Sequence, residues 1–228
     1  MEGRSLSKTV SAPGWLWAVL ALLLVFNFAD QSLQSPLLNP LLADFFGQTS
    51  TLIPLGWVTF TFTLLSAAAT IAAGLLAGRR SRLRLCLAGA LTYGVVGLLT
   101  VFIPHGRTGY AFFFLARALA GLGIGLIVPA VFALASDLAA AGRRSTAFGF
   151  LSVAMLAGRM AGFLAGGGLG DDWRTAYGLI GAINLALAGA LVFLREPARG
   201  VREPELREVL LAGAEYRFRW SRKDLASL

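Results

Sequence analysis

The chain has 228 residues, of which 57% are hydrophobic and only 14% are charged. Soluble domains carry about 25% charged residues, so this composition favours a protein that spans a membrane. The net charge of +8 is spread over links and tail rather than gathered in one groove, which indicates anionic lipid headgroups and no nucleic-acid partner. Cys86 is the single cysteine, which excludes an intrachain disulfide and a cysteine-based metal site, and we expect no metal and no cofactor.

Six apolar stretches are long enough to cross the hydrocarbon core as helices, which takes about 20 residues. In chain order they cover approximately residues 14–40, 51–77, 83–103, 109–136, 145–169 and 174–194. The first is too long for the apolar part of a signal peptide, and further spans follow it, so we expect it to be retained. Residues 1–13 are then a cytoplasmic leader, 14–194 a transmembrane domain and 195–228 a cytoplasmic tail or linker.

The links between these stretches alternate between basic and weakly basic. Lys and Arg are retained on the cytoplasmic side of a membrane, whereas translocated loops contain few of them. The link around Asp44 has no basic residue. The second and fourth links hold Arg79, Arg80, Arg82, Arg84, Arg143 and Arg144. The alternation predicts an all-α, multi-pass protein of the cell (inner) membrane with both termini in the cytoplasm.

Three ionisable residues fall inside the apolar stretches: Asp30, Arg117 and Arg159. A charge near the bilayer centre costs at least ~2.5–3.5 kcal/mol on insertion scales, so it usually faces a cavity or a partner. Counted along each helix at about 1.5 Å per residue, the three lie at a comparable depth. One interpretation is structural, with Asp30 neutralising one arginine and joining helices. The other is a site whose two arginines bind an anionic or zwitterionic solute while Asp30 carries a proton.

Polar and glycine residues near these charges extend the prediction. Candidates for hydrogen bonds at the site are Asn27, Gln31, Gln34 and, in the sixth stretch, Asn184. A single Asn in a membrane helix more often bonds to a neighbouring helix, and this alternative applies to Asn184. Glycines at every fourth position of the fifth stretch share one face, which predicts close packing of two helices. They are Gly158, Gly162 and Gly166.

Two segments carry a family resemblance. Gly74-Leu-Leu-Ala-Gly-Arg-Arg-Ser-Arg82 resembles the signature loop of the major facilitator superfamily, Gly-x-x-x-Asp-Arg-x-Gly-Arg-Arg, at Gly74, Arg79 and Arg82, with Gly78 in place of the Asp and Ser81 in place of the second Gly. The run from Arg117 through Gly121 and Gly125 to Pro129 is similar to the fourth helix of that superfamily, and Asp137 with Arg143 to the loop that follows. The resemblance covers nearly the whole chain.

A narrower likeness concerns the first and fourth stretches. Asn27-Phe-Ala-Asp30 together with Arg117 resembles the spinster-type lysolipid transporters, although Gln31 stands where an Arg follows the Asp and Ile124 where a Glu is common. This resemblance implies a proton-linked secondary transporter of a small anionic or amphiphilic solute.

The superfamily's transporters consist of two six-helix halves, each made of two inverted three-helix repeats. This chain has the content of one half, the N-terminal one. We expect a truncated or split reading frame or one partner of a separate second half, and a subunit of a homodimer is the remaining alternative. We do not expect an enzyme, because the only histidine, His105, lies in an outer loop. The alternative to a transporter half is a non-transporting scaffold or regulatory subunit, or an inactive fragment.

Overall fold

The computed structural model describes residues 14–47, 51–77, 80–168 and 172–194. The predicted leader 1–13, the tail 195–228 and Arg79 of the signature loop lie outside the described residues.

The described residues form helices without strands. In chain order they are α1 (Gly14–Leu33), α2 (Leu38–Phe46), α3 (Ile53–Ala77), α4 (Arg82–Leu99), α5 (Gly106–Leu138), α6 (Arg144–Gly168) and α7 (Trp173–Val192), with short 3-10 turns η1 (Thr100–Phe102) and η2 (Ala141–Arg143). Six of them are long and apolar enough to cross a membrane: α1, α3, α4, α5, α6 and α7. The predicted all-α membrane fold is confirmed, and five of the six predicted stretches match their helices within a few residues.

The first predicted stretch is wrong at its outer end. It was expected to run to residue 40, but α1 ends at Leu33 and a separate helix, α2, begins at Leu38. Pro36 lies between them, and a proline has no N–H to donate and disfavours helix at the residue before it. Pro40 falls in the first turn of α2, where a missing N–H costs nothing. The two prolines therefore end one helix and fit the start of the next.

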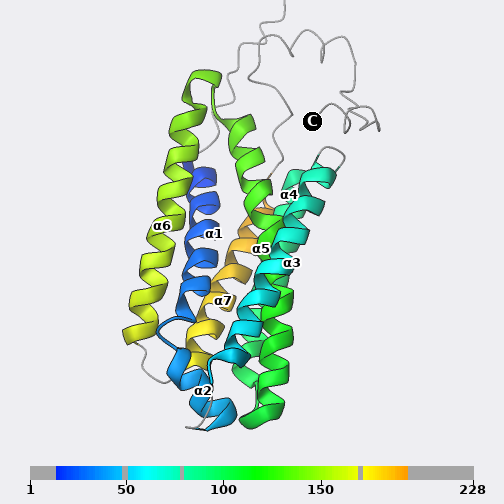
Figure 1. Ribbon diagram of the computed structural model, residues 1–228. Helices are drawn as coiled ribbons and strands as arrows, with labels where there is room; N and C mark the ends of the chain where they lie inside the picture. Colours follow the sequence, from blue (N-terminus) through cyan, green and yellow to red (C-terminus); the bar gives the residue numbers. More distant parts are fainter. Residues whose placement is uncertain (1–13, 48–50, 78–79, 169–171, 195–228) are drawn as a thin grey trace, which may run out of the picture.

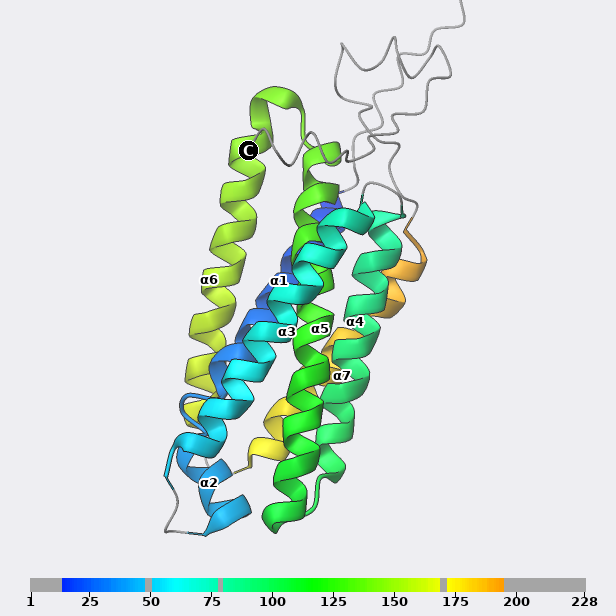
Figure 2. The ribbon, with the colours of Figure 1, turned by 45° about the vertical axis from the view of Figure 1, so that its right-hand side comes forward.

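The six long helices pair in a symmetric way. α1 packs against α6, α3 against α5, and α4 against α7, and the contacts of α4 with α5 have a counterpart in those of α1 with α7. Figures 1 and 2 show α6 beside α1 and α3 beside α5. Exchanging the first triplet (α1, α3, α4) with the second (α5, α6, α7) leaves these pairs unchanged. This is the arrangement of two inverted three-helix repeats, as predicted.

The basic links gather at one end of the bundle. The end of α3, the start of α4 and the turn between α5 and α6 lie at the upper end of the molecule in Figure 1, and α2 lies at the opposite end. The structure therefore separates the arginine-rich links from the link around Asp44, in agreement with the alternation along the sequence.

Glycines set the closest helix contacts. Gly158, Gly162 and Gly166 form part of the buried face of α6. A Cβ atom at Gly162 would stand 2.6 Å from the Cα atom of Ala29 in α1. On α5, a Cβ at Gly121 would stand 2.5 Å from the backbone oxygen of Phe62 in α3. The predicted packing of the α6 glycines against another helix is confirmed, because a Cβ at Gly158 or Gly162 would meet the backbone of α1 and one at Gly166 would meet the side chain of Pro36.

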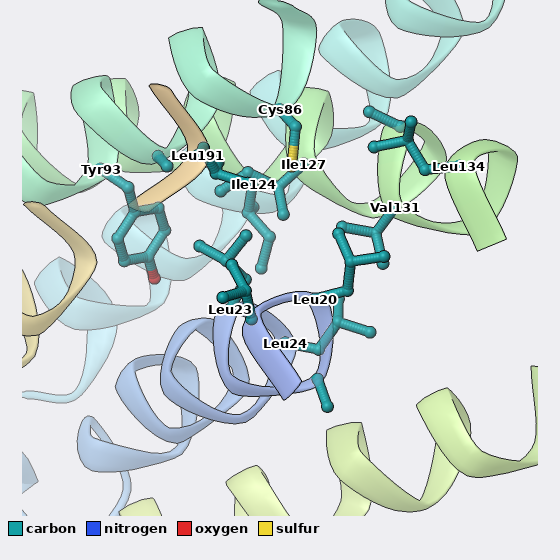
Figure 3. Close-up of a cluster of buried hydrophobic side chains, with 14 of the residues drawn as sticks. Leu20, Leu23, Leu24, Cys86, Tyr93, Ile124, Ile127, Val131, Leu134 and Leu191 are labelled. Atoms are coloured by element: carbon teal, nitrogen blue, oxygen red, sulfur yellow. The ribbon is translucent and has the colours of Figure 1, made fainter. Parts of the chain in front are cut away.

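Apolar side chains fill the bundle on both sides of its polar middle. In one cluster, Leu20, Leu23 and Leu24 of α1 meet Ile124, Ile127 and Val131 of α5, with Cys86 and Tyr93 of α4 alongside (Figure 3). A second cluster joins α2 to α5 and α7 through Leu41, Phe45, Phe113, Trp173 and Tyr177. Phe28 belongs to the first cluster and Ala29 to the second, so Asn27 and Asp30 sit where the two clusters meet.

Candidate functional site

The centre of the site is a buried ion pair between α1 and α5. The Nη1 atom of Arg117 donates to Oδ2 of Asp30 at 2.5 Å, and the two side chains are 6% and 2% exposed. The hydroxyl of Tyr93, from α4, donates to the same carboxylate oxygen. The Asp30 carboxylate, on α1, thus accepts hydrogen bonds from side chains on α4 and α5. Such charge-assisted hydrogen bonds are stronger than neutral ones, and burial removes competition from water.

Two aromatic rings flank the guanidinium of Arg117. Its Cζ atom lies 5.0 Å from the ring centroid of Phe62 on α3 and 4.9 Å from that of Tyr177 on α7. Both distances are within the range of an attractive cation–π contact. Arg117 on α5 thus contacts side chains from α1, α3 and α7. Tyr93 adds α4 through its hydrogen bond to Asp30, so five of the six membrane-spanning helices meet at this site.

Several buried polar atoms at this level find no hydrogen-bond partner among the described residues. They are Nε of Arg117, the hydroxyl of Tyr177 and Oδ1 of Asn27. Buried polar groups are nearly always paired in proteins, and exceptions are typical of functional sites. The polar middle of the bundle therefore has donors and acceptors to spare.

A second polar link joins α1 to α7 one turn from Asp30. Nδ2 of Asn27 donates to Oδ1 of Asn184 at 2.8 Å and to the backbone oxygen of Leu23 at 2.6 Å. Asn184 in turn donates to the backbone oxygen of Ile180 at 3.0 Å. Both asparagines are fully buried. The alternative considered for Asn184, a bond to a neighbouring helix, is the arrangement observed.

Gln34 lies in the turn that follows α1, and its side chain contacts α3. Its Nε2 atom donates to Oγ1 of Thr59 at 2.9 Å and to the backbone oxygen of Leu55 at 3.3 Å. Gln31 is half-buried. Of the predicted polar neighbours, Asn27 and Gln34 therefore join α1 to other helices.

Arg159 lies apart from the buried pair. Its side chain is exposed on α6, and its Cζ atom lies 5.2 Å from the ring centroid of Phe28 on α1. Phe28 and Asp30 are two positions apart on one helix, about 200° around its axis, so they point to opposite sides. The structure thus places Arg159 near the depth of Asp30 but outside the bundle interior. It brings together Asp30 and Arg117, and not all three charges.

The signature loop ties α4 to α5 at the basic end. Nη1 of Arg82 donates to Oδ2 of Asp137, near the end of α5, and to the backbone oxygen of Ala133 at 3.2 Å. Ser81, which replaces the family's glycine, is the N-cap of α4 and accepts from the N–H of Arg84 at 3.1 Å.

The remaining motif residues have structural places. Gly74 lies within α3 with open space around it, Pro129 lies inside α5, and Gly125 packs against α3. Arg143 is exposed at the end of η2.

A second charged cluster, at the opposite end, was not predicted. Asp44 of α2 accepts from Nη2 of Arg174 at 2.8 Å and contacts Nδ1 of His105. Nε of Arg174 donates to the backbone oxygen of Ile103 at 2.9 Å, and the guanidinium lies 4.3 Å from the ring centroid of Trp173. The cluster fastens α2 to the start of α7 and to the link before α5. In the sequence, the indication of this cluster was Asp44, an acidic residue in a link that has no basic residue.

Sequence reasoning also missed three aromatic residues at the site: Phe62, Tyr93 and Tyr177. In a sequence they resemble any other core aromatic. A tyrosine in the middle of an apolar stretch was the available indication, because a buried tyrosine hydroxyl usually finds a partner.

Comparison with known proteins identifies this architecture. A sequence model of the Major Facilitator Superfamily matches residues 20–226. The chain belongs to the major facilitator superfamily. Its helices therefore form an integral, multi-pass membrane protein with the half-fold of that superfamily. No curated relative matches the chain.

Solved transporter structures share the fold. A bacterial homolog of the human lysosomal transporter Spinster, in an inward-facing and unoccupied conformation, superposes with a TM-score of 0.70 at 18% identity, over 85% of this chain and 46% of that one. A D-xylose–proton symporter gives 0.65 at 16% identity, over 87% and 52%. A peptide transporter, POT, carrying an E310Q mutation gives 0.65 at 19%, over 90% and 45%. The chain thus spans about half the length of these superfamily members, and at such identities the likeness concerns the fold.

Proposed function

We propose that this chain is the N-terminal half of a secondary, proton-coupled transporter for a small anionic or amphiphilic solute. The observation that carries the proposal is the ion pair of Asp30 and Arg117, buried inside a bundle of membrane-spanning helices. Intramembrane ionisable residues are costly and usually mark ion or solute pathways. The similar structures support it at the level of the fold, and one of them is a proton symporter.

Asp30 is the proton carrier in this proposal. As a carboxylate it holds α1 to Arg117 and Tyr93. A proton on Asp30 removes the negative charge, so the charge-assisted bond to Arg117 is lost and the contact between α1 and α5 weakens. A change of one charge at the meeting point of several helices thereby alters helix packing, which alternating access requires.

Arg159 is the solute-binding cation. It is exposed on α6, which with α3 is among the least buried of the membrane-spanning helices. An arginine at this depth is unfavourable in lipid, so the face of α6 that carries Arg159 borders a water-filled cavity or a partner. Transporters of this fold hold solute between their two halves near the midplane. We therefore place the second half, separate or supplied by another copy, opposite Arg159, with both termini in the cytoplasm of a cell membrane.

The test is transport in proteoliposomes. The protein, alone and copurified with its native membrane partners, is assayed for uptake of radiolabelled lysophosphatidylglycerol, an anionic amphiphile, with and without a pH gradient. The gradient should accelerate uptake. Asp30→Asn should abolish the acceleration while leaving downhill uptake, and Arg159→Gln should weaken uptake itself. Arg107→Gln, an exposed charge in the first turn of α5, is the control.

Two results would contradict the proposal. Full stimulation by the gradient in Asp30→Asn removes the assigned role of that carboxylate. Absence of uptake in every preparation favours instead a non-transporting six-helix scaffold or regulatory subunit.

A further inference from the structure

The surroundings of Arg117 contain more than its carboxylate partner. The guanidinium lies between the ring of Phe62 on α3 and the ring of Tyr177 on α7, at 5.0 and 4.9 Å. Phe62 and Tyr177 are 9% and 1% exposed, so both contacts are largely shielded from water. Both contacts are made by uncharged rings, so neither depends on whether Asp30 carries a proton.

The backbone is arranged to permit this contact. Arg117 and Gly121 are one turn apart on the same face of α5. A Cβ atom at Gly121 would meet the backbone of Phe62, with its oxygen 2.5 Å away. Gly121 thus lets α3 approach α5 at Phe62, and the ring reaches the guanidinium one turn further out.

Proton binding to Asp30 creates a specific difficulty. Arginine stays protonated in proteins, so a neutral Asp30 leaves a buried cation without its counter-charge. Leaving one member of a buried pair uncompensated is strongly unfavourable. A site that cycles between the two states needs a second interaction that stabilises the guanidinium and does not depend on Asp30. Cation–π contacts have this property, and they strengthen when the pair is desolvated.

We propose that Phe62 and Tyr177 form an aromatic clamp, two positioning residues that keep Arg117 buried and in place while Asp30 is protonated. The clamp deepens, and rests on, the proposed proton coupling. Because the rings belong to α3 and α7, Arg117 stays with those helices when Asp30 releases it. The proton then separates α1 from the site without displacing the arginine.

A double-mutant cycle tests the clamp without transport. The apparent Tm of the full chain in mild detergent is measured for Phe62→Leu, Asp30→Asn and the double variant. Asp30→Asn imitates the protonated state, so Phe62→Leu should lower the Tm by roughly 2–6 °C more in the Asp30→Asn background than in the wild type. Phe60→Leu, an exposed phenylalanine on the same helix, should lower it equally in both backgrounds. Additive effects of Phe62→Leu and Asp30→Asn would overturn the clamp.

Variants of Tyr177 separate the ring from its hydroxyl. Tyr177→Phe keeps the ring and should retain the wild-type stimulation of lysophosphatidylglycerol uptake by a pH gradient. Tyr177→Leu removes the ring and should lose most of that stimulation. If Tyr177→Phe and Tyr177→Leu lose the same share of the stimulation by a pH gradient, the aromatic ring is not required for coupling and the clamp is refuted. If the wild type shows no stimulation at all, the proposed proton coupling fails, and the stability cycle still decides the clamp.

Discussion

Gly162→Ala tests the packing of α6 on α1. A Cβ atom at Gly162 would stand 2.6 Å from both the Cα and the carbonyl carbon of Ala29. The carbonyl oxygen of Ala29 would lie nearer still, and ordinary contacts of this kind are 3.4–4 Å long, so the two helices must separate by at least about 1 Å at this point. The neighbouring atoms are backbone and cannot turn aside. Gly149, on the exposed side of α6, has no atom within 4 Å of its Cβ position and supplies the matched control.

The magnitude follows from two opposing terms. A gap of about 0.5–1 Å forfeits a quarter to a half of each dispersion contact across the interface, and overpacking typically costs ~1–3 kcal/mol. Contacts with backbone place Gly162→Ala at the upper end of that range. Alanine regains up to ~1 kcal/mol of helix propensity, which leaves a net destabilisation near ~2 kcal/mol. Gly149→Ala gains the propensity alone, so the two variants should differ by roughly 2–3 kcal/mol.

The assay is thermal unfolding of both variants in mild detergent, followed by circular dichroism. A difference of that size corresponds to an apparent Tm that is roughly 4–12 °C lower for Gly162→Ala than for Gly149→Ala. Equal Tm values would refute the reasoning, because they would show that α6 does not pack on α1 through this glycine face.

Three further predictions concern the two ends of the bundle. Asp137→Asn removes the partly buried ion pair between α4 and α5 and should lower the free energy of unfolding in detergent by roughly 1–3 kcal/mol. An unchanged free energy of unfolding would show that this ion pair does not stabilise the contact. Asp44→Asn removes the charged partner of Arg174 that holds α2 to α7 and should lower the apparent Tm in detergent, whereas an unchanged Tm would count against a fastening role. Asp172 caps α7 by accepting from the Thr175 N–H, and hydrogen bonds from the side chain and then the backbone of Thr175 lower the Asp172 pKa. Its stabilisation is therefore complete above the unfolded-state pKa of about 4 and is lost as the pH falls through the lower folded-state pKa, so the difference in Tm between wild type and Asp172→Ala should be largest at pH 6 and shrink steadily below about pH 4.

The topology was predictable because it depends on periodicity and charge along the chain. Apolar length gave the spans, and the spacing of Gly158, Gly162 and Gly166 gave a packing face, since both follow from helix geometry alone. The break between α1 and α2 was missed because apolar length alone defined the first span, although Pro36 and Pro40 lie within it. Pro36 removes a donor in mid-helix, whereas Pro40 suits a new first turn, and that difference was present in the sequence.

The site was predictable in part, because sequence gives depth and does not give direction. Counting residues placed Asp30, Arg117 and Arg159 at one level, but which arginine meets the carboxylate depends on how each helix is rotated. Phe62 and Tyr177 could not be found this way. Their contacts with Arg117 arise from three helices packing together, and no local pattern marks an aromatic residue that faces a cation.

The position of the charge pair within the bundle shows how a single proton would act under the proposed coupling. One side of α1 lies against the glycines of α6, with backbone close to backbone. Its polar side reaches the other helices: Asn27 bonds to α7, Asp30 to α4 and α5, and Gln34 to α3. Asn27 and Asp30 are three residues apart and share one helix face, and Gln34 follows in the turn after α1. The α6 side is formed by glycine and apolar contacts together with the Arg159–Phe28 contact, and it includes no carboxylate, whereas the links to the other helices include the Asp30 carboxylate. Neutralising Asp30 therefore acts selectively on the contact between the α1–α6 pair and the rest of the half.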